Sequence, residues 1–262
     1  MRQFIEYVGQ KTVSWLDEIG YMSVLFADCI YWILVGKSKK QAVKIADIIS
    51  EATKIGVNAA LISSLLCFAV GVMLAIQGVE TLKPYGAESK VITGIALSIT
   101  REFAPLIVGI LIAGRSGSAI TARIGTMLQS QEIDALRVIG INPVRFLAAP
   151  VLLAMFIAVP TLTVLGDFMG LYGGAVYVSS ELHISLGVYF ERVLSALSLA
   201  DIYQGLIKSI VFAYIIAIVS LSNGFQVRGG AEGVGTATTR SVVASISYII
   251  LADMVFTFLL NQ

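Results

Sequence analysis

The chain has 262 residues, of which 57% are hydrophobic and 13% are charged. Soluble domains average about 45 to 50% apolar and about 25% charged residues, so this composition predicts an integral membrane protein. The net charge of +1 argues against a nucleic-acid partner, because phosphate binding requires a basic surface. The two cysteines and single histidine suggest neither a disulfide framework nor a metal site.

The first 35 residues mix apolar and charged positions, which is typical of an amphipathic helix lying in the membrane interface. Within them, residues 21–35 are apolar but short and carry Asp28, so we interpret them as the end of an interfacial elbow. Basic residues then precede the first long apolar run, namely Lys37, Lys39, Lys40, Lys44 and Lys54. By the positive-inside rule they predict a cytoplasmic N-terminus.

Long apolar runs follow, each near or above the ~20 residues that a membrane span needs. They cover residues 56–78, 91–113, 147–178, 204–222 and 242–260. The sequence therefore predicts an all-α fold with five transmembrane helices. Segment 114–146 is rich in arginine and would lie inside, whereas the acidic connection 179–201 would lie outside. An odd number of spans places the C-terminus outside.

Two charges, Arg101 and Glu102, interrupt the second run. A charge at the centre of a membrane helix costs about 2.5 to 3.5 kcal/mol, so such a pair needs partners or a polar cavity. Lys208 and Asp253 lie toward the outer ends of later spans, and we expect Glu102 to pair with Lys208 and Arg101 with Asp253. Pro105 should disrupt the helix beside the pair, because it lacks the N–H that the Arg101 carbonyl would accept. Such a network could also serve packing alone.

Segment 114–146 predicts two short amphipathic helices separated by a polar step at residues 129–131. The first has an apolar stripe that includes Ile120 and Ile124, and the second has one that includes Ile133 and Leu136. These helices could rest on the membrane surface or dock a soluble partner. The chain has no GxxxxGK[ST] motif, so any nucleotide-driven work must come from another chain.

Gly166, Gly170 and Gly174 recur every four residues in the third run, which gives a smooth ridge for close helix packing. We expect this ridge to pack within the chain rather than at a dimer contact, and we expect the neighbouring Asp167 to face water. The glycine-rich stretch 229–235 has no preceding strand and no adjacent lysine, so we interpret it as a turn rather than a phosphate site.

Two long segments carry a resemblance to a known family. They are TREFAPLIVGILIAGRSGSAITARIGTMLQSQEIDALRVIGINPVRFLAAP and NGFQVRGGAEGVGTATTRSVVAS. Together they resemble the MlaE family of ABC-transporter permeases, and the likeness covers roughly residues 50–260. The resemblance implies one permease domain over 1–262, with an interfacial or elbow helix at 1–35, a transmembrane bundle at 56–260 and a cytoplasmic coupling region at 117–139.

The resemblance also implies a function and its partners. Permeases of this family are homodimers in the bacterial inner (cytoplasmic) membrane that move phospholipids between the inner and outer membranes and maintain outer-membrane lipid asymmetry. Two MlaF-type ATPases, which use ATP and Mg, an MlaB-type cytoplasmic subunit and an MlaD-type MCE-domain hexamer on the periplasmic side would complete the transporter. This chain would itself hold no cofactor, no catalytic residue and no metal, and its C-terminus would be periplasmic.

Site residues follow from the resemblance position by position. The ATPase-coupling residues would be Gly117, Arg123, Gln131, Glu132 and Arg137. The intramembrane charge network would be Arg101, Glu102, Lys208 and Asp253, and the lipid-binding residues would be Leu74, Tyr85 and Arg101. Thr81 stands where the family pattern suggests a more apolar residue. Ordinary packing is an equal alternative for Leu74, and Tyr85 could be an interfacial anchor.

Two other classes of function stay open at this point. A membrane-embedded enzyme that modifies lipids would need a nucleophile with a base, or a metal site, and the only histidine lies outside the predicted bundle. A membrane scaffold without transport activity would explain the coupling region but would leave the intramembrane charges without a transport role.

Overall fold

The computed structural model describes residues 2–36 and 41–260, and within these ranges it contains helices and no strand. The predicted all-α membrane fold is confirmed. Six helical stretches are long and apolar enough to cross a membrane: Leu16–Val35, Ile45–Tyr85, Ser89–Gln129, Val144–Glu181, Leu199–Phe225 and Gly230–Leu259. Five of them match the five predicted spans, the last of them up to Leu259, and the additional one, Leu16–Val35, lies in the N-terminal helix.

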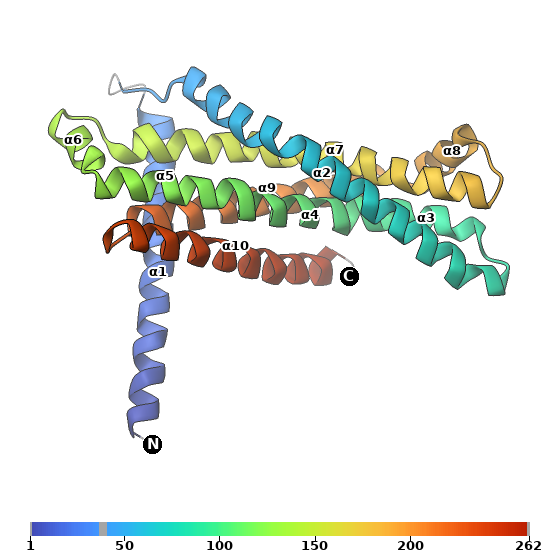
Figure 1. The fold of residues 1–262 in the computed structure, drawn as a ribbon, viewed down its shortest axis with the longest axis horizontal. Helices are drawn as coiled ribbons and strands as arrows, with labels where there is room; N and C mark the ends of the chain where they lie inside the picture. The colour runs from blue at the N-terminus through green and yellow to red at the C-terminus, as the bar shows by residue number, and fades with distance from the viewer. Residues whose placement is uncertain (1, 37–40, 261–262) are drawn as a thin grey trace.

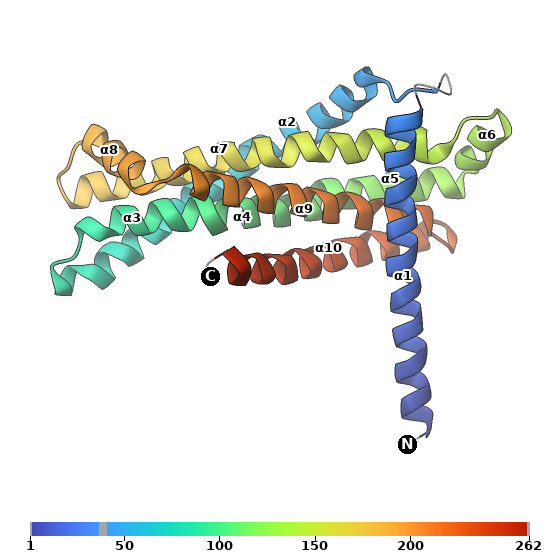
Figure 2. The ribbon, with the colours of Figure 1, turned by 180° about the vertical axis from the view of Figure 1, so that it is seen from behind.

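The helices follow one another with short connections. In chain order they are α1 (Arg2–Val35), α2 (Ile45–Leu82), η1 (Lys83–Tyr85), α3 (Ser89–Ser98), η2 (Ile99–Phe103), α4 (Ala104–Ile112), η3 (Ala113–Gly117), α5 (Ser118–Gln129), α6 (Glu132–Val138), η4 (Val144–Ala148), α7 (Ala149–Glu181), α8 (Leu186–Ala196), α9 (Leu199–Phe225) and α10 (Gly230–Leu260). Figures 1 and 2 show the long helices other than α1 running lengthwise through one bundle, with α6 at one end of the bundle and α8 at the other. We call these the α6 end and the α8 end.

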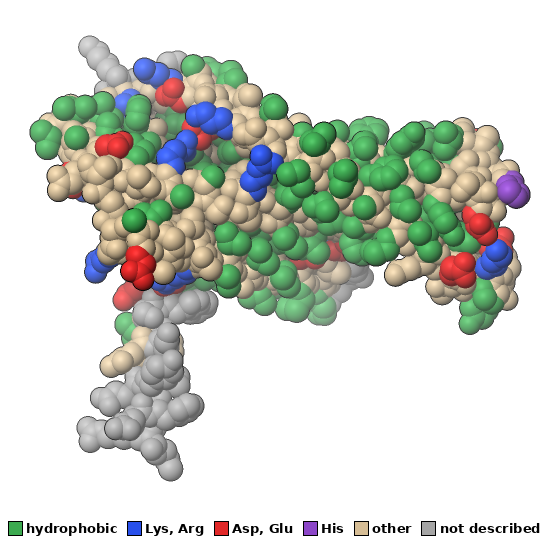
Figure 3. All heavy atoms as spheres, in the orientation of Figure 1, with side chains coloured by type: hydrophobic (Ala, Val, Ile, Leu, Met, Phe, Trp, Pro, Cys, Tyr) green, Lys and Arg blue, Asp and Glu red, His purple; other side chains and the backbone are tan. Residues whose placement is uncertain are grey.

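The surface of the bundle matches a membrane protein. In Figure 3, apolar side chains cover the middle of the visible face, and charged side chains gather toward its two ends. Helix α1 crosses the bundle near its α6 end and its N-terminal half projects away (Figures 1 and 2). It continues without a break to Val35, so residues 21–35 and the preceding residues form one helix. Its orientation in a membrane stays a prediction.

The second span is one continuous helical stretch, Ser89–Gln129, with two π-helical turns, η2 and η3, inserted in it. Pro105 lies in the first turn of α4, where its missing N–H is tolerated best. The π-helix η2 directly precedes it and contains the charged pair. The expected disruption beside Pro105 therefore takes the form of a π-helix, a feature that often occurs at functional sites.

The two helices predicted in segment 114–146 are present as α5 and α6. The prediction that both are separate surface helices is wrong for α5, which continues α4 through η3 and packs against α9 and α10. Its apolar stripe points into the bundle, since Ile120 is 4% exposed and Ile124 is fully buried. Gln131 ends this continuity with a left-handed φ of 61°, so only α6 turns away from the bundle.

The glycine ridge of α7 packs inside the chain, as predicted. A Cβ built at Gly166 would lie 2.9 Å from the Cys67 Sγ of α2, and a Cβ at Gly71 of α2 would overlap the backbone of Gly170. Small residues on both helices thus let α2 and α7 approach closely. Asp167, expected to face water, is half-buried, and its Oδ1 is buried without a hydrogen-bond partner in the described part of the chain.

We expect Gly71→Ala to lower stability by about 1 to 3 kcal/mol, because the added methyl group meets rigid backbone rather than a flexible side chain. Thermal unfolding of the detergent-solubilised protein measures the effect. Gly56→Ala is the matched control on the same helix, since a Cβ there meets nothing within 4 Å. Equal melting temperatures for the two variants would contradict the close α2–α7 contact.

Candidate functional site

A cluster of charged side chains joins three helices inside the bundle. Lys208 of α9 is 1% exposed, and its Nζ donates to Glu102 Oε2 at 2.5 Å and to Thr257 Oγ1 at 3.0 Å. The Thr257 hydroxyl in turn lies 3.1 Å from both Glu102 oxygens. Asp253 Oδ1 lies 3.0 Å from Lys208 Nζ as an ion pair without hydrogen-bond geometry. One ammonium group therefore faces two carboxylates from η2 and α10.

The predicted pairing of Glu102 with Lys208 is confirmed, and the predicted pairing of Arg101 with Asp253 is wrong. Arg101 Nε donates to Asp201 Oδ1 at 2.7 Å, and Arg101 Nη2 contacts the same oxygen. Adjacent helical residues point about 100° apart, so Arg101 and Glu102 meet different neighbours. Asp201 and Lys208 are seven residues apart on α9, which puts them two turns apart on one face of that helix.

Asp201 is the functional candidate that the sequence reasoning missed, because the residue was assigned to an acidic outer loop. It actually lies in the first turn of α9 and is 2% exposed. Its Oδ2 accepts hydrogen bonds from the Ser198 N–H at 2.7 Å and the Ser198 hydroxyl at 2.8 Å. The spacing Ser-x-x-Asp before an apolar run is a capping signal that could have identified this helix start.

Among the residues that the structure describes, the groove that Leu74 lines includes neither of the other two predicted lipid-binding residues. Leu74 is half-buried and lines a groove of about 380 Å³ between α2 and α3 near the α8 end, together with Thr81 and Lys90. Tyr85 is 80% exposed in η1, and neither Tyr85 nor Arg101 lines this groove. Thr81 does line the groove despite its departure from the family pattern.

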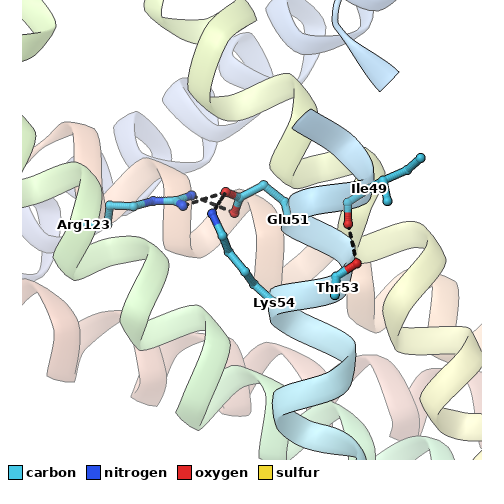
Figure 4. A network of polar contacts seen from close by, with 5 residues as sticks. All are labelled: Ile49, Glu51, Thr53, Lys54 and Arg123. Atoms are coloured by element: carbon cyan, nitrogen blue, oxygen red, sulfur yellow. Dashed lines mark hydrogen bonds and ion pairs between the residues drawn. The ribbon is translucent and has the colours of Figure 1, made fainter. Parts of the chain in front are cut away.

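The predicted coupling residues divide into two groups. Three lie at the α6 end: Gln131 precedes α6, Glu132 accepts a hydrogen bond from the Ser130 hydroxyl at 2.8 Å, and Arg137 donates to Asp134 at 3.0 Å. The other two lie on η3 and α5. Gly117 is buried in η3, and Arg123 of α5 donates two hydrogen bonds to Glu51 of α2, at 2.8 and 3.0 Å (Figure 4).

Buried hydroxyl groups also tie α5 to its neighbours. The Thr121 hydroxyl lies 2.9 Å from both the Ser220 carbonyl of α9 and the Ser241 hydroxyl of α10. All three side chains are fully buried. Because a buried polar group is costly to leave unpaired, this seam fixes α5 against α9 and α10.

The described residues contain no group of three or more His, Cys, Asp or Glu side chains that could hold a metal ion. The model of one family, described as "Permease MlaE", matches residues 48–259. The chain belongs to the MlaE permease family. The match covers both sequence segments that resemble this family, and it includes the charge cluster, α5 and α6.

Relatives of known name agree with this family. A "probable ABC transporter permease protein" of Rickettsia typhi is 32% identical over 97% of this chain and 96% of its own length. The "intermembrane phospholipid transport system permease protein MlaE" of Haemophilus influenzae is 28% identical over 97% of this chain and 96% of its own length. A chloroplast protein of Arabidopsis thaliana, "TRIGALACTOSYLDIACYLGLYCEROL 1", is 37% identical over 72% of this chain and 54% of its own length.

Proposed function

We propose that this chain is the permease subunit of an ABC transporter that moves phospholipids between the inner and outer membranes of a bacterium and maintains outer-membrane lipid asymmetry. Family membership and the name of the Haemophilus influenzae relative support this function. The observation that carries it is the continuous helical stretch Ser89–Gln129, which connects the charge cluster inside the bundle to the α6 end. The α6 end would lie in the cytoplasm and the α8 end in the periplasm, in line with the basic residues of segment 114–146.

A mechanical route supports coupling between the two ends. Helix α5 is held to α9 and α10 by its buried hydroxyl seam and to α2 by the Arg123–Glu51 pair. A displacement applied at α6 would therefore move these helices together rather than α5 alone. The π-helices η2 and η3 lie on the same route, and such turns are natural places for local adjustment in an otherwise regular helix.

The lipid would meet the bundle in its outward half. The groove beside Leu74 is mostly apolar and is also lined by Lys90 and Thr81, which suits a lipid with an acyl chain and a polar head group. The Arg101 side chain is 34% exposed, so its guanidinium group retains donors for a phosphate while Asp201 holds one side of it. In a homodimer, two such halves would enclose the substrate.

The α6 end has an exposed apolar surface that supports docking of an ATPase. Val138 is 87% exposed and Ile139 is 68% exposed, directly after the coupling residues Glu132 and Arg137. Apolar side chains exposed outside the bilayer mark an interaction site. We assign it to an MlaF-type ATPase, which would hold ATP and Mg, assisted by an MlaB-type subunit. An MlaD-type MCE hexamer would receive or deliver lipid at the α8 end.

We expect Val138→Asp with Ile139→Asp to reduce co-purification of the ATPase at least tenfold, because a docked apolar surface tolerates no unpaired charge. ATP-dependent transfer of fluorescent phospholipid from proteoliposomes to acceptor vesicles should fall in parallel. Leu194→Asp is the control, since Leu194 is 75% exposed on α8 at the opposite end. Normal assembly and transfer in the double variant would contradict the coupling role of α6, and an assembled transporter that moves no phospholipid would contradict the proposed function.

A further inference from the structure

A polar recess lies on the outside of the bundle, between α2 and α5 on the half toward the α6 end. We call it the α2–α5 hollow. Its volume is about 180 Å³, and its lining residues are Glu51, Lys54, Ile55, Asn58, Arg115, Ser116, Ala119, Ile120 and Arg123. It shares no residue with the charge cluster or with the groove beside Leu74. Apart from the Arg123–Glu51 pair, which also holds α5 to α2, the hollow is separate from the sites described above.

The α2–α5 hollow carries an excess of positive charge. Arg123 and Lys54 both pair with Glu51, the latter at 3.1 Å (Figure 4). Arg115 donates to the Asn58 carbonyl, which cannot neutralise it. Three cations thus face one carboxylate, for a formal net charge of +2 (3 − 1). In addition, Arg123 Nε is buried and has no hydrogen-bond partner among the described residues.

The level of the hollow along α2 matches the level of lipid head groups in a bilayer. From Lys54 to Leu82, α2 rises by about 42 Å, and a bilayer with its head groups measures about 40 to 45 Å. If Leu82 stands at one head-group layer, Lys54 stands at the other. Figure 3 shows basic side chains on this half of the visible face, with an apolar surface beside them toward the α8 end. Arg115 follows the apolar helix α4, which ends at Ile112, at the same boundary.

An apolar path leads from the hollow toward the membrane centre. Lys54, Asn58, Leu61 and Leu65 follow one face of α2, because they are spaced three or four residues apart. Leu61 is 80% exposed and Leu65 is 65% exposed. A ligand that fits both features has an anionic phosphate and a hydrocarbon chain. A free phosphate would leave the leucine face uncovered, and an acidic protein segment would have to enter the bilayer to reach it.

We infer that the α2–α5 hollow binds a phospholipid of the leaflet at the α6 end, with its phosphate on Lys54 and Arg115 and an acyl chain along Leu61 and Leu65. This inference rests on the proposed function for the orientation of the α6 end and for the lipid class. It adds a second lipid position, in the leaflet opposite the groove beside Leu74. Because the site has a net positive charge, it should prefer phosphatidylglycerol over zwitterionic phosphatidylcholine.

The test uses the full-length permease without an ATPase, reconstituted with equimolar phosphatidylglycerol and phosphatidylcholine and then re-extracted in mild detergent. Mass spectrometry measures the phosphatidylglycerol retained per protein. We expect Lys54→Gln with Arg115→Gln to lower retention about tenfold or more, since each basic side chain near the surface contributes attraction to anionic lipid. Arg192→Gln removes one basic side chain at the α8 end and should leave retention unchanged. The conservative variant Lys54→Arg with Arg115→Lys keeps both charges and should retain as much phosphatidylglycerol as the wild type.

Three outcomes would overturn the inference. They are equal retention in the wild type and the double glutamine variant, an equal loss in Arg192→Gln, and calorimetric binding of inorganic phosphate that is as tight as that of phosphatidylglycerol. The last outcome would identify a free-anion site. Because no ATPase is present, a failure of phospholipid transport would leave this result unchanged. Equal phosphatidylglycerol retention in the wild type and the double glutamine variant, together with normal transport, would contradict only the second lipid position.

Discussion

Lys208→Met is expected to destabilise the permease by about 3 to 5 kcal/mol, the cost of breaking a buried ion pair from one side. The Lys208 ammonium is the shared partner of Glu102 and Asp253. Without it, two carboxylates and the Thr257 hydroxyl remain around an apolar side chain. Thermal unfolding in detergent measures the loss, and phospholipid transfer should fall with it. A Lys208→Met variant with the same melting temperature as the wild type would contradict the role of Lys208 as the shared partner of Glu102 and Asp253.

The variant that separates packing from transport neutralises the whole cluster. Lys208→Met combined with Glu102→Gln and Asp253→Asn leaves no buried charge and should recover most of the lost stability, because uncharged replacements of buried ion pairs are often tolerated. If this stable triple variant transfers no phospholipid, the charges act in transport. If it transfers phospholipid at the wild-type rate, the cluster serves packing alone, which is the alternative that the sequence left open.

The membrane spans could be predicted because each depends on a local property. A run of about 20 apolar residues satisfies its own backbone hydrogen bonds as a helix and needs no knowledge of its neighbours. The same reasoning failed for α5, whose polar residues suggested a surface helix. The Thr121 hydroxyl is hydrogen-bonded to Ser220 and Ser241, which are 99 and 120 residues away in sequence. Polarity alone does not distinguish a solvated helix from one with buried partners.

Of the four charged residues predicted to form one network, Glu102, Lys208 and Asp253 meet in the cluster, whereas Arg101 pairs with Asp201. Buried charges need opposite charges, so Lys208 and Asp253 could be selected from the few candidates in the spans. Asp201 was overlooked because it stands outside the apolar core of its span, even though Ser198 marks it as a helix start. Which carboxylate meets Arg101 depends on the rotation of α9 and α10 about their axes, and no local pattern specifies that rotation.

The Arg101–Asp201 pair gives a second large expected effect. Asp201→Ala should lower stability by about 2 kcal/mol, because it removes the carboxylate of the α9 capping box and the partner of a partly exposed arginine together. Asp201→Asn keeps an oxygen that can accept from Ser198 and should cost less. Ser198→Ala, which removes only the hydroxyl part of the cap, should cost about 1 kcal/mol. Thermal unfolding of the three variants shows whether the α9 capping bonds or the Arg101 ion pair contributes more to stability. An Asp201→Ala variant as stable as the wild type would contradict both contributions.

Measurements of lipid retention test whether Arg101 binds phospholipid when its ion pair with Asp201 is removed. If Arg101 binds the phosphate of the transported lipid, Asp201→Asn should raise phospholipid retention because the guanidinium loses its competing carboxylate, whereas Arg101→Ala should lower it. A double-mutant cycle then identifies the partner. Arg101→Ala should show coupling of about 1 kcal/mol with Asp201→Asn and almost none with Asp253→Asn, since Asp253 is held by Lys208. The reverse pattern would restore the pairing of Arg101 with Asp253 and would place Asp201 in the cap of α9 alone.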